Sequence, residues 1–483
     1  MNNKEIAVIN LFKECFQFLQ SLNFGQKSYS IFVHNLGSFD GYFIFKYLNI
    51  IYKSDTEQKI HSIIDAENKF IKIDFKDNIH IKFIVSARIF PVSLEGLCNV
   101  FNGGEGKVFK YNEAFNSIDM LSNNSLLTSF IKYSLNDSII LYKSILNASI
   151  TYIEKYDIDF SDSLSLSSLS LTVYRKKKFQ SIDIPILKHK IDTFVKDSYY
   201  GGSTDYYLKY VKKVYYYDVN SLYPYAMLKD MPHNPIRFIT NFTNIPLENF
   251  FGFALAKITS PPNIKIPLLI HRYEGKVIHP TGTWVGVYFS EELKAMQKHG
   301  YKIELIKGIE FTKEILFKDY IDHFYAIKKN ATGPLRWIAK MHLNTLYGIF
   351  GRKKDTLETI TVNNEDIPKI FLLKVVKSIV EINDQSILLT INNLDPDILL
   401  PEVELNSTID GDISNTFIDI KSNVAIASAI TSYARIHMMQ FKTGSFQDQI
   451  AYTDTDSIFL TQPLPESLVG QELGLMKDEL DGK

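Results

Sequence analysis

Apolar and polar positions repeat with two different periods in the first part of the chain. A period of about 3.6 residues is typical of amphipathic helices, and near alternation is typical of strands. By these patterns, helices are expected at 6–22, 39–51 and 126–152, and strands at 29–33, 70–75 and 79–85. The last two strands flank Lys76, Asp77 and Asn78 and are predicted to form a hairpin. A serine-rich patch at 161–170 is typical of a loop or a helix cap.

The second part of the chain also mixes strand and helix patterns, and proline and glycine separate them. We place a domain boundary at 190, which divides the chain into 1–190 and 191–483. The stretch 383–415 is polar and has few helix signals, so it is predicted to be an inserted loop or a small β-hairpin subdomain. The predicted fold class is α/β, with the mixed order of elements found in α+β folds.

Composition narrows the class of protein. The chain has 483 residues, of which 45% are apolar, enough for several domains with a large core. No apolar run reaches the roughly eighteen residues of a membrane-spanning helix, so no membrane partner is expected. Cys15 and Cys98 are the two cysteines, which excludes a disulfide framework and a Cys/His zinc site. Ile, Asn, Lys, Phe and Tyr, which share AT-rich codons, are abundant and hint at an AT-rich genome.

The formal net charge of -1 does not by itself indicate a nucleic-acid binder, but the charges are unevenly spread. Basic residues cluster at 175–178, 209–213, 328–329 and 352–354, and acidic residues crowd 395–419. Such a distribution is compatible with a basic channel beside an acidic outer face. Solvated charges without a partner are the alternative.

A strand-like aromatic run ends in Asp218 and is followed by Ser221, Leu222, Tyr223 and Pro224. A carboxylate at a strand end is well placed to hold a hard cation. Taken alone, an Asp after a strand is more often a helix cap.

A second acidic motif lies near the C-terminus, where apolar residues flank Asp454, Thr455 and Asp456. The pattern predicts a β-hairpin with two carboxylates at its tip. Acids beside so many apolar groups are costly to bury, and a metal ion removes that cost. The alternative is a solvent-exposed Asp turn.

A third motif is a predicted helix from Gly333 to Gly348. Arg336, Lys340, Asn344 and Tyr347 stand three or four residues apart, so they share one face of this helix. Two cations, an amide and a phenol on one face suit a triphosphate and a base pair. The alternative is a solvated cationic stripe.

In this order, Asp…Ser-Leu-Tyr-Pro, Lys-x₃-Asn-Thr-x-Tyr-Gly and Tyr-x-Asp-Thr-Asp-Ser resemble motifs A, B and C of the family B DNA polymerases. The resemblance covers about residues 35–480. It implies an RNase H-like exonuclease domain, followed by the palm and fingers of a right-hand polymerase with insertions. It also implies template and primer DNA and deoxynucleoside triphosphates as partners, and two Mg²⁺ ions as cofactors, with Mn²⁺ plausible.

The resemblance assigns roles to the motif residues. Asp218, Asp454 and Asp456 are the expected catalytic acids, and Asp218, Asp456 and the carbonyl of Val219 are the expected metal ligands. The expected nucleotide-binding residues are Ser221, Leu222, Tyr223, Arg336, Lys340, Asn344 and Tyr347. Tyr223 is expected to pack under the sugar and exclude a 2′-hydroxyl. Lys328 and Lys329 are predicted to be more exposed and to contribute less.

Further strings resemble the protein-primed branch, including the polymerases on linear plasmids of fungal mitochondria. Tyr199, Gly201 and Gly202 match a Tyr-x-Gly-Gly linker, and Ser93 and Leu94 begin a short single-strand-binding pattern, so all five are predicted to bind DNA. Asn35 and Asp40 resemble the second exonuclease motif, and Tyr133 and Asp137 the third. A terminal priming protein and a mitochondrial location are therefore expected. The long stretches between motifs are expected to hold two insertions, one that grips the priming protein and one that aids processivity.

The resemblance is incomplete at both ends. An Asp-x-Glu pair is expected before Asn35 and is not found, so nuclease activity is predicted to be lost or very weak. A thumb is expected after the strand-like run 473–479, but the sequence stops at Lys483. We therefore expect a polymerase truncated at both ends. The alternatives are an inactive fragment that only binds DNA, or a weak 3′–5′ exonuclease.

Overall fold

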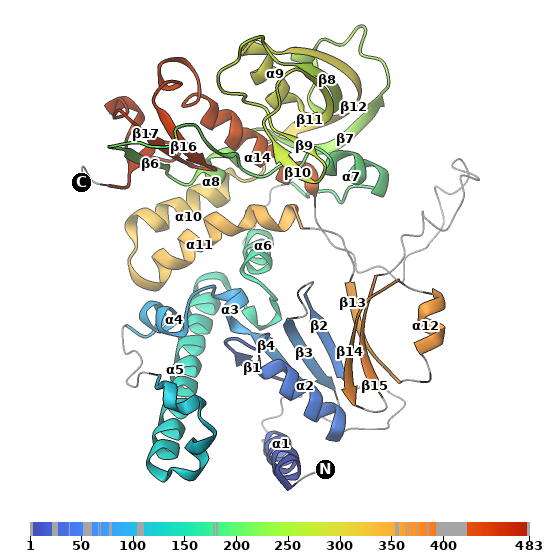
Figure 1. The fold of residues 1–483 in the computed structure, drawn as a ribbon, viewed down its shortest axis with the longest axis vertical. Helices are drawn as coiled ribbons and strands as arrows, with labels where there is room; N and C mark the ends of the chain where they lie inside the picture. Colours follow the sequence, from blue (N-terminus) through green and yellow to red (C-terminus); the bar gives the residue numbers. More distant parts are fainter. Residues whose placement is uncertain are drawn as a thin grey trace. The chain divides into compact units, whose positions relative to one another are not determined.

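The computed structural model divides the chain into two compact units (Figure 1). Unit 1 holds Met1–Leu169 and Lys353–Ile420, and unit 2 holds Ser170–Arg352 and Lys421–Lys483. The structure describes residues 3–21, 28–37, 39–51, 60–65, 67, 69–76, 80–103, 111–176, 179, 182–352, 357–363, 365, 367–373, 375–383, 386–392 and 423–480. This division differs from the predicted boundary at 190, because the chain returns to unit 1 after Arg352.

Unit 1 is built on a four-stranded sheet and a three-stranded sheet. Its helices are α1 (Asn3–Ser21), α2 (Asp40–Ile51), α3 (Ser86–Ile89), α4 (Leu94–Phe101), α5 (Asn124–Tyr156) and α12 (Ile367–Leu373), with α6 (Leu166–Lys176) crossing into unit 2. Its strands are β1 (Ser28–Val33), β2 (Ile60–Ile64), β3 (Phe70–Lys76), β4 (His80–Val85), β13 (Leu357–Asn363), β14 (Val375–Asn383) and β15 (Ser386–Asn392). The predicted helices and strands of this part are present, although α6 begins inside the serine-rich patch.

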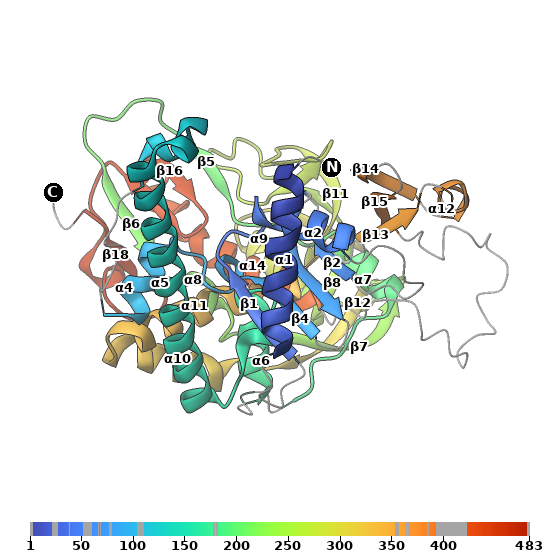
Figure 2. The same cartoon turned by 90° about the horizontal axis from the view of Figure 1, so that it is seen from below.

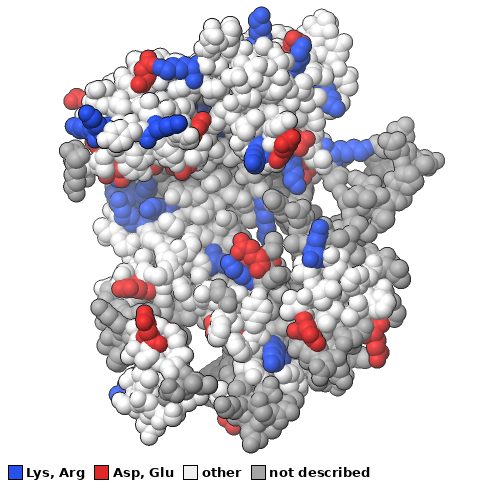
Figure 3. Space-filling model, in the orientation of Figure 1, with Lys and Arg blue, Asp and Glu red and all other residues white. Residues whose placement is uncertain are grey.

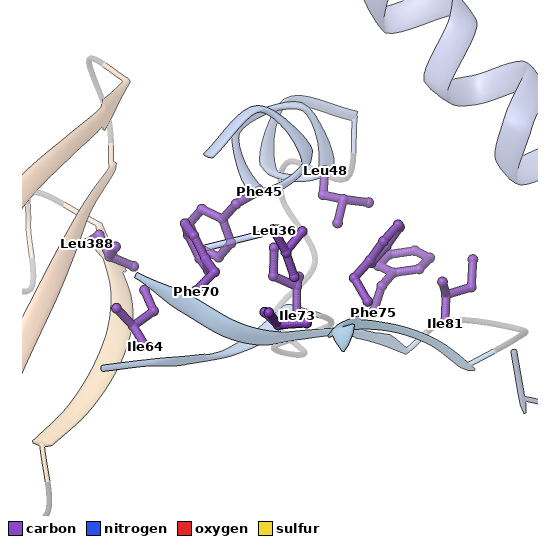
Figure 4. Packing of buried hydrophobic residues seen from close by; sticks show 11 residues of the cluster. Leu36, Phe45, Leu48, Ile64, Phe70, Ile73, Phe75, Ile81 and Leu388 are labelled. Atoms are coloured by element: carbon purple, nitrogen blue, oxygen red, sulfur yellow. The ribbon is translucent and has the colours of Figure 1, made fainter. Parts of the chain in front are cut away.

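The first sheet has the order β1-β4-β3-β2. β3 and β4 form the expected antiparallel hairpin, and β1 pairs with β4 in parallel. Ile73 and Phe75 alternate with polar residues and point to one face, and a register shift between β2 and β3 brings Phe70 into the same core. Phe45 and Leu48 of α2 cover this core (Figure 4). The buried core of unit 1 therefore follows the period-2 and period-3.6 patterns of the sequence.

Residues 357–392 form the antiparallel sheet β13-β15-β14. Ile387, Leu389 and Ile391 pack on one side of β15 with α12, which lies beside β14 and β15 in Figures 1 and 2. Leu388 faces the opposite way, into the core of the first sheet (Figure 4). A hairpin is thus present at the start of the polar stretch 383–415, and its residues 393–415 lie outside the described part of the chain.

Unit 2 contains the two acidic motifs and the helical motif. Its helices are α7 (His189–Lys196), α8 (Leu222–Ala226), α9 (Ser290–Lys298), α10 (Lys318–Asn330), α11 (Gly333–Phe350) and α14 (Val424–Met439). Its strands are β5 (Thr204–Tyr206), β6 (Tyr215–Val219), β7 (Met231–Ile239), β8 (Gly252–Thr259), β9 (His271–Tyr273), β10 (Lys276–Ile278), β11 (Thr283–Phe289), β12 (Lys302–Glu314), β16 (Ile450–Asp454), β17 (Ser457–Leu460) and β18 (Met476–Asp478).

One sheet of unit 2 has the order β18-β6-β17-β16-β5, and a second has the order β11-β8-β12-β7. The long, almost wholly buried helix α14 contacts α7, α8, α9 and α11, so it forms the centre of the unit. α10 and α11 form a helical hairpin (Figure 1). Gly348 lies inside α11, which ends at Phe350 rather than at the predicted stop. Among the described helices, none is long and apolar enough to cross a membrane.

Candidate active site

The sheet β18-β6-β17-β16-β5 brings the two acidic motifs together. Asp218 on β6 is the cross-strand partner of Ser457 on β17, and Ser457 directly follows Asp456. The Val219 N–H donates to the carbonyl of Asp456 at 2.8 Å, which fixes the end of β6 against the β16–β17 turn. Residues more than two hundred positions apart in sequence therefore form a single carboxylate pair.

Two strained residues flank this pair. Thr455, in the turn between β16 and β17, has φ 54°, and Ser221, just after β6, has φ 56°. The left-handed region costs roughly 1–2 kcal/mol for a residue with a Cβ, and most for a β-branched one such as Thr455. Strain of this kind persists only where the surroundings hold the backbone, and it is common at functional sites.

The carboxylates destabilise one another's charged forms. Burial, followed by the charges of Asp456 and Glu479, raises the pKa of Asp218 to about 6. Burial is also the largest cause of the raised pKa of Asp456, to which Asp454 adds. Both shifts mean that negative charge is concentrated in a half-buried site, where a cation would be bound favourably.

Asp454 is held differently from the other two acids. Its carboxylate accepts a hydrogen bond from the Thr204 hydroxyl at 2.8 Å and another from the Thr455 hydroxyl at 3.1 Å. Tyr452 also approaches it, at 3.4 Å. Asp454 is exposed and lies on β16, which β17 separates from β6 in the sheet. This arrangement suits a supporting acid beside the Asp218–Asp456 pair.

The helical motif presents a polar face. Arg336, Lys340 and Asn344 are exposed on α11, whereas Ile338, Leu343 and Leu346 on the other side are buried. Figure 3 shows Lys and Arg side chains gathered over the α10–α11 hairpin. The face is therefore a cationic surface in the same unit as the carboxylates.

Tyr223 and Tyr347 join the first motif to the third. Their rings stack with centroids 4.2 Å apart and an interplanar angle of 25°. Burial is the largest cause of the raised pKa of both phenols, and the charge of Asp456 raises both further. Two of the predicted nucleotide-binding side chains thus lie together beside the carboxylates.

Lys328 was predicted to be more exposed than Lys340 and to contribute less to nucleotide binding. The predicted exposure is wrong. Its Nζ donates to the Ser221 hydroxyl at 2.8 Å. Burial, and then the charges of Lys340 and Arg336, lower its pKa, while Asp218 raises it. The Arg336 guanidinium also donates to the Lys328 carbonyl at 2.8 Å. Lys328 therefore belongs to the same cationic group as Lys340 and Arg336.

Lys329, its neighbour, is exposed as predicted and pairs with Glu472 at 3.0 Å. The two lysines share the same local context at the end of α10, and only their side-chain directions separate them. Lys477 was also missed. It is the cross-strand partner of Asp218, and its charge lowers the pKa of that carboxyl.

The residues present fit a divalent cation. Asp218 and Asp456 are oxygen donors whose raised pKa values would be relieved by a positive ion. Among the described residues there is no group of three or more His, Cys, Asp or Glu suited to a metal. Mg²⁺ commonly binds through one or two carboxylates together with water and substrate phosphates, so a carboxylate pair is sufficient.

The predicted linker Tyr199–Gly202 lies against the acidic turn. The Arg435 guanidinium donates to the carbonyls of Tyr200 and Gly201, at 2.9 and 2.8 Å. Arg435 itself is buried in a bidentate pair with Glu292. Gly202 contacts Thr455 so closely that an added Cβ would lie 2.3 Å from the threonine hydroxyl. The glycine is therefore needed for packing, whereas its role in DNA binding stays a prediction.

The exonuclease-like residues lie in unit 1. Asn35 follows β1 and Asp40 begins α2, where burial raises the pKa of its carboxyl. Tyr133 and Asp137 lie one turn apart on α5. Ser93 caps α4 by accepting the Gly96 N–H at 3.1 Å, and Leu94 is the first residue of that helix. This cap explains the local sequence, and the nuclease and DNA-binding roles of these residues stay predictions.

Comparison with known proteins agrees with the three motifs. A family model described as DNA polymerase type B, organellar and viral, matches residues 105–446. The chain belongs to this family. The probable DNA polymerases of Podospora anserina and Neurospora intermedia are 31% and 30% identical to it over 95% and 93% of the chain. The resemblance to family B polymerases drawn from the motifs is thereby confirmed.

This chain spans about half the length of these two relatives, 45% of the first and 50% of the second. A DNA polymerase of Bacillus phage phi29 is 30% identical over 37% of the chain. The structure of phi29 DNA polymerase with primer-template DNA and incoming nucleotides matches 93% of this chain and 75% of that one, with a TM-score of 0.65 and 21% identity. The predicted fold class, an exonuclease-like domain followed by palm and fingers, is therefore confirmed.

Proposed function

We propose that this chain carries the nucleotidyl-transfer site of a DNA-directed DNA polymerase that is primed by a protein. The observation that carries the proposal is the pairing of Asp218 with the Asp456 turn across β6 and β17. It lies beside the stacked Tyr223 and Tyr347 and the lysines of α10 and α11. Template and primer DNA and deoxynucleoside triphosphates are the proposed substrates, by analogy with phi29 DNA polymerase, which forms a ternary complex with primer-template DNA and incoming nucleotides.

In this proposal the acidic residues bind metal ions and the basic residues bind the triphosphate. Asp218 and Asp456 would hold two Mg²⁺ ions, which supply activation of the attacking hydroxyl and neutralisation of the leaving pyrophosphate. Lys340, Arg336 and Lys328 would bind the triphosphate, since charge-assisted contacts to phosphate are the strong ones. Tyr223 would pack under the deoxyribose, and Tyr347 and Asn344 would line the new base pair. In-line phosphoryl transfer needs mainly such positioning and charge stabilisation.

The finer parts of the proposal rest on the resemblance and composition. Priming by a terminal protein is proposed from the resemblance of the motifs to the protein-primed branch. The sheet β11-β8-β12-β7 lies in the sequence between the first and third motifs, and the sheet β13-β15-β14 lies between the third and second, which are the positions expected for the two insertions. Replication of a linear plasmid in a mitochondrion is proposed from the motifs and from the AT-rich codon bias of the composition. A half-complete set of exonuclease motifs gives no independent support for a nuclease.

Primer extension tests the function. The purified chain is incubated with a primed template, deoxynucleotides and Mg²⁺, and products are resolved by length. Asp456→Asn should lower extension by at least about 1,000-fold, on the scale seen when a main transition-state charge partner is lost. Asp448→Asn, an exposed Asp just before β16, is the matched control and should leave extension unchanged. A wild-type chain that binds primed DNA but never extends it would favour the DNA-binding fragment instead.

A further inference from the structure

A buried lysine, Lys442, lies just beyond α14 and has no part in the chemistry described so far. Its side chain is 5% exposed, and its Nζ donates to the Ser203 hydroxyl at 2.8 Å. Ser203 Oγ lies 2.8 Å from Nε2 of His279, whose Nδ1 lies 3.6 Å from the Asp205 carboxylate. Four side chains from three separate segments therefore form one polar chain.

The direction of the hydrogen bonds follows from the charges. Burial, and then the nearby Lys442 charge, lower the pKa of His279 to about 4, so its ring is neutral at pH 7. The Lys442 ammonium can only donate, so Ser203 accepts from it and donates its own proton to Nε2 of His279. Nδ1 then carries the remaining ring proton and faces Asp205. The network has one consistent arrangement, which fixes the Ser203 side chain.

Ser203 in turn touches the acidic turn. Its carbonyl accepts the backbone N–H of Thr455 at 3.1 Å. Its neighbours contact the same turn, since Gly202 packs on the Thr455 side chain and the Thr204 hydroxyl donates to Asp454. Thr455 separates Asp454 from Asp456 and is the residue of this turn with strained φ. A strained threonine needs such external contacts to stay in place.

Burying Lys442 is unfavourable for the stability of the fold. Burial lowers the pKa of its amine to about 8, which means that the charged form is disfavoured inside the fold. Asp205 raises that pKa and Arg435 lowers it further. An apolar residue of similar length avoids this desolvation, and replacing buried charges by apolar groups is often neutral or stabilising. Stability alone therefore does not account for the lysine.

We infer that Lys442 and His279 are positioning residues, which hold residues 202–204 against the Asp454–Thr455 turn by sharing the Ser203 hydroxyl. The expected effect of these residues on catalysis rests on the proposed function. Their effect on the position of residues 202–204 does not depend on that function. His279 follows β10, in the segment between the first acidic motif and α11. The position of that inserted segment is thus tied to the geometry of the carboxylates.

Hydrogen exchange of the intact chain tests the structural part. In Lys442→Met, peptides that cover 452–458 should exchange at least about tenfold faster, because the Thr455 amide loses its fixed acceptor. The melting temperature should stay the same or rise. Lys294→Met is the matched control, since Lys294 is a largely buried lysine that pairs with Glu291 and does not contact this network. Unchanged exchange at 452–458 would overturn the inference, as would faster exchange across the whole chain with a lower melting temperature.

Primer extension tests the catalytic part. Lys442→Met and Ser203→Ala should each lower kcat by on the order of tenfold with little change in nucleotide KM, because a displaced turn misplaces reacting groups. The double variant should be no slower than the slower single variant, since both changes break the same contact. Additive losses would overturn the shared-hydroxyl mechanism. A wild-type chain without extension would instead contradict the proposed function, and the exchange experiment would still decide the positioning role.

Discussion

At the scale of single residues, charge is sorted into two neighbouring groups. The carboxylates of Asp218 and Asp456 have raised pKa values because they are buried near one another and near other acids. Lys328 has a lowered pKa because it is buried near Lys340 and Arg336. Each group is unfavourable by itself, and each is relieved by a ligand of opposite charge. A metal–triphosphate complex carries both positive and negative charge. The carboxylate group and the cationic group together therefore indicate this type of ligand more specifically than either group does alone.

Lys328 and Lys340 should therefore matter to a similar degree. We expect Lys328→Ala and Lys340→Ala each to raise the nucleotide KM and lower kcat, with a combined loss of about 2–4 kcal/mol in transition-state stabilisation. Lys329→Ala is the control, because Lys329 is exposed and pairs with Glu472. Steady-state extension over a range of nucleotide concentrations measures all three. A Lys328→Ala enzyme that behaves like Lys329→Ala would exclude Lys328 from the triphosphate site.

Tyr223 is the residue expected to select the sugar. Its ring is stacked on Tyr347 and cannot move aside without breaking that contact. Tyr223→Ala should raise the ratio of ribonucleotide to deoxyribonucleotide incorporation by roughly 10–200-fold, the range for removing a steric contact in a substrate pocket. Competition assays measure the ratio, and Tyr210→Ala, at a phenol that is 80% exposed, is the control. Equal discrimination in Tyr223→Ala and wild type would assign sugar selection to another group.

At the scale of elements, the spacing of apolar residues predicted most helices and strands, but it did not predict which elements pack against one another. α5 and the β3–β4 hairpin follow strong local patterns, and the acidic hairpin was expected because two Asp residues interrupt an apolar run. α11 was predicted with its polar face, but Gly348 proved compatible with two more helical residues because the buried Phe350 extends the packed side. Arg435 and Glu292 form a fully buried ion pair that no local pattern indicates, since the two lie on different helices.

α11 also contains a histidine, His342, that makes the free energy of unfolding depend on pH. His342 is fully buried, with its ring stacked on Phe324 at 4.9 Å, and burial lowers its pKa to about 3. The unfolded chain protonates this group below about 6.5, whereas the folded chain keeps it neutral. The folded state therefore binds fewer protons, and stability is lost as pH falls from about 6.5 toward 3.

Replacing His342 by Leu should remove this acid sensitivity. Between pH 7 and pH 5, wild type should lose about 2 kcal/mol of unfolding free energy from this residue alone, and His342→Leu should lose that much less. Urea denaturation at the two pH values gives the difference directly. His61→Gln, at an exposed histidine of unit 1, is the control. A pH dependence that is the same in His342→Leu and wild type would mean that other groups carry the acid sensitivity.

At the scale of the whole molecule, the chain leaves unit 1, builds most of unit 2 and then returns. The family and the order of the polymerase motifs could be predicted from the sequence, because each motif is a short local string. The return of 353–420 to unit 1 could not be predicted from the sequence. β15 is an almost continuous apolar run with both faces buried, and such a run does not indicate which element each face packs against. Long-range packing is the information that a local pattern lacks.

Leu388 gives a direct test of that return. It is 6% exposed and packs in one cluster with Ile64 and Phe70 of the first sheet, so β15 completes a core that begins more than three hundred residues earlier (Figure 4). Leu388→Ala should destabilise unit 1 by about 2–4 kcal/mol, because a buried Leu-to-Ala change removes apolar contact and leaves a cavity. Ile379→Ala on β14 is the control, since that side chain is 54% exposed and should change stability by less than about 0.5 kcal/mol.

Hydrogen exchange locates the effect within the chain. In Leu388→Ala, amides of β2 and β3 should exchange faster because their core is loosened. Amides of β6, β16 and β17 in unit 2, which we call the palm strands, should keep the wild-type rate. Primer extension at a temperature where both units are folded should then be unchanged, because the Asp218–Asp456 pair lies wholly within unit 2. Faster exchange in the palm strands, with β2 and β3 unaffected, would mean that residues 353–420 support the polymerase site and not the exonuclease-like unit.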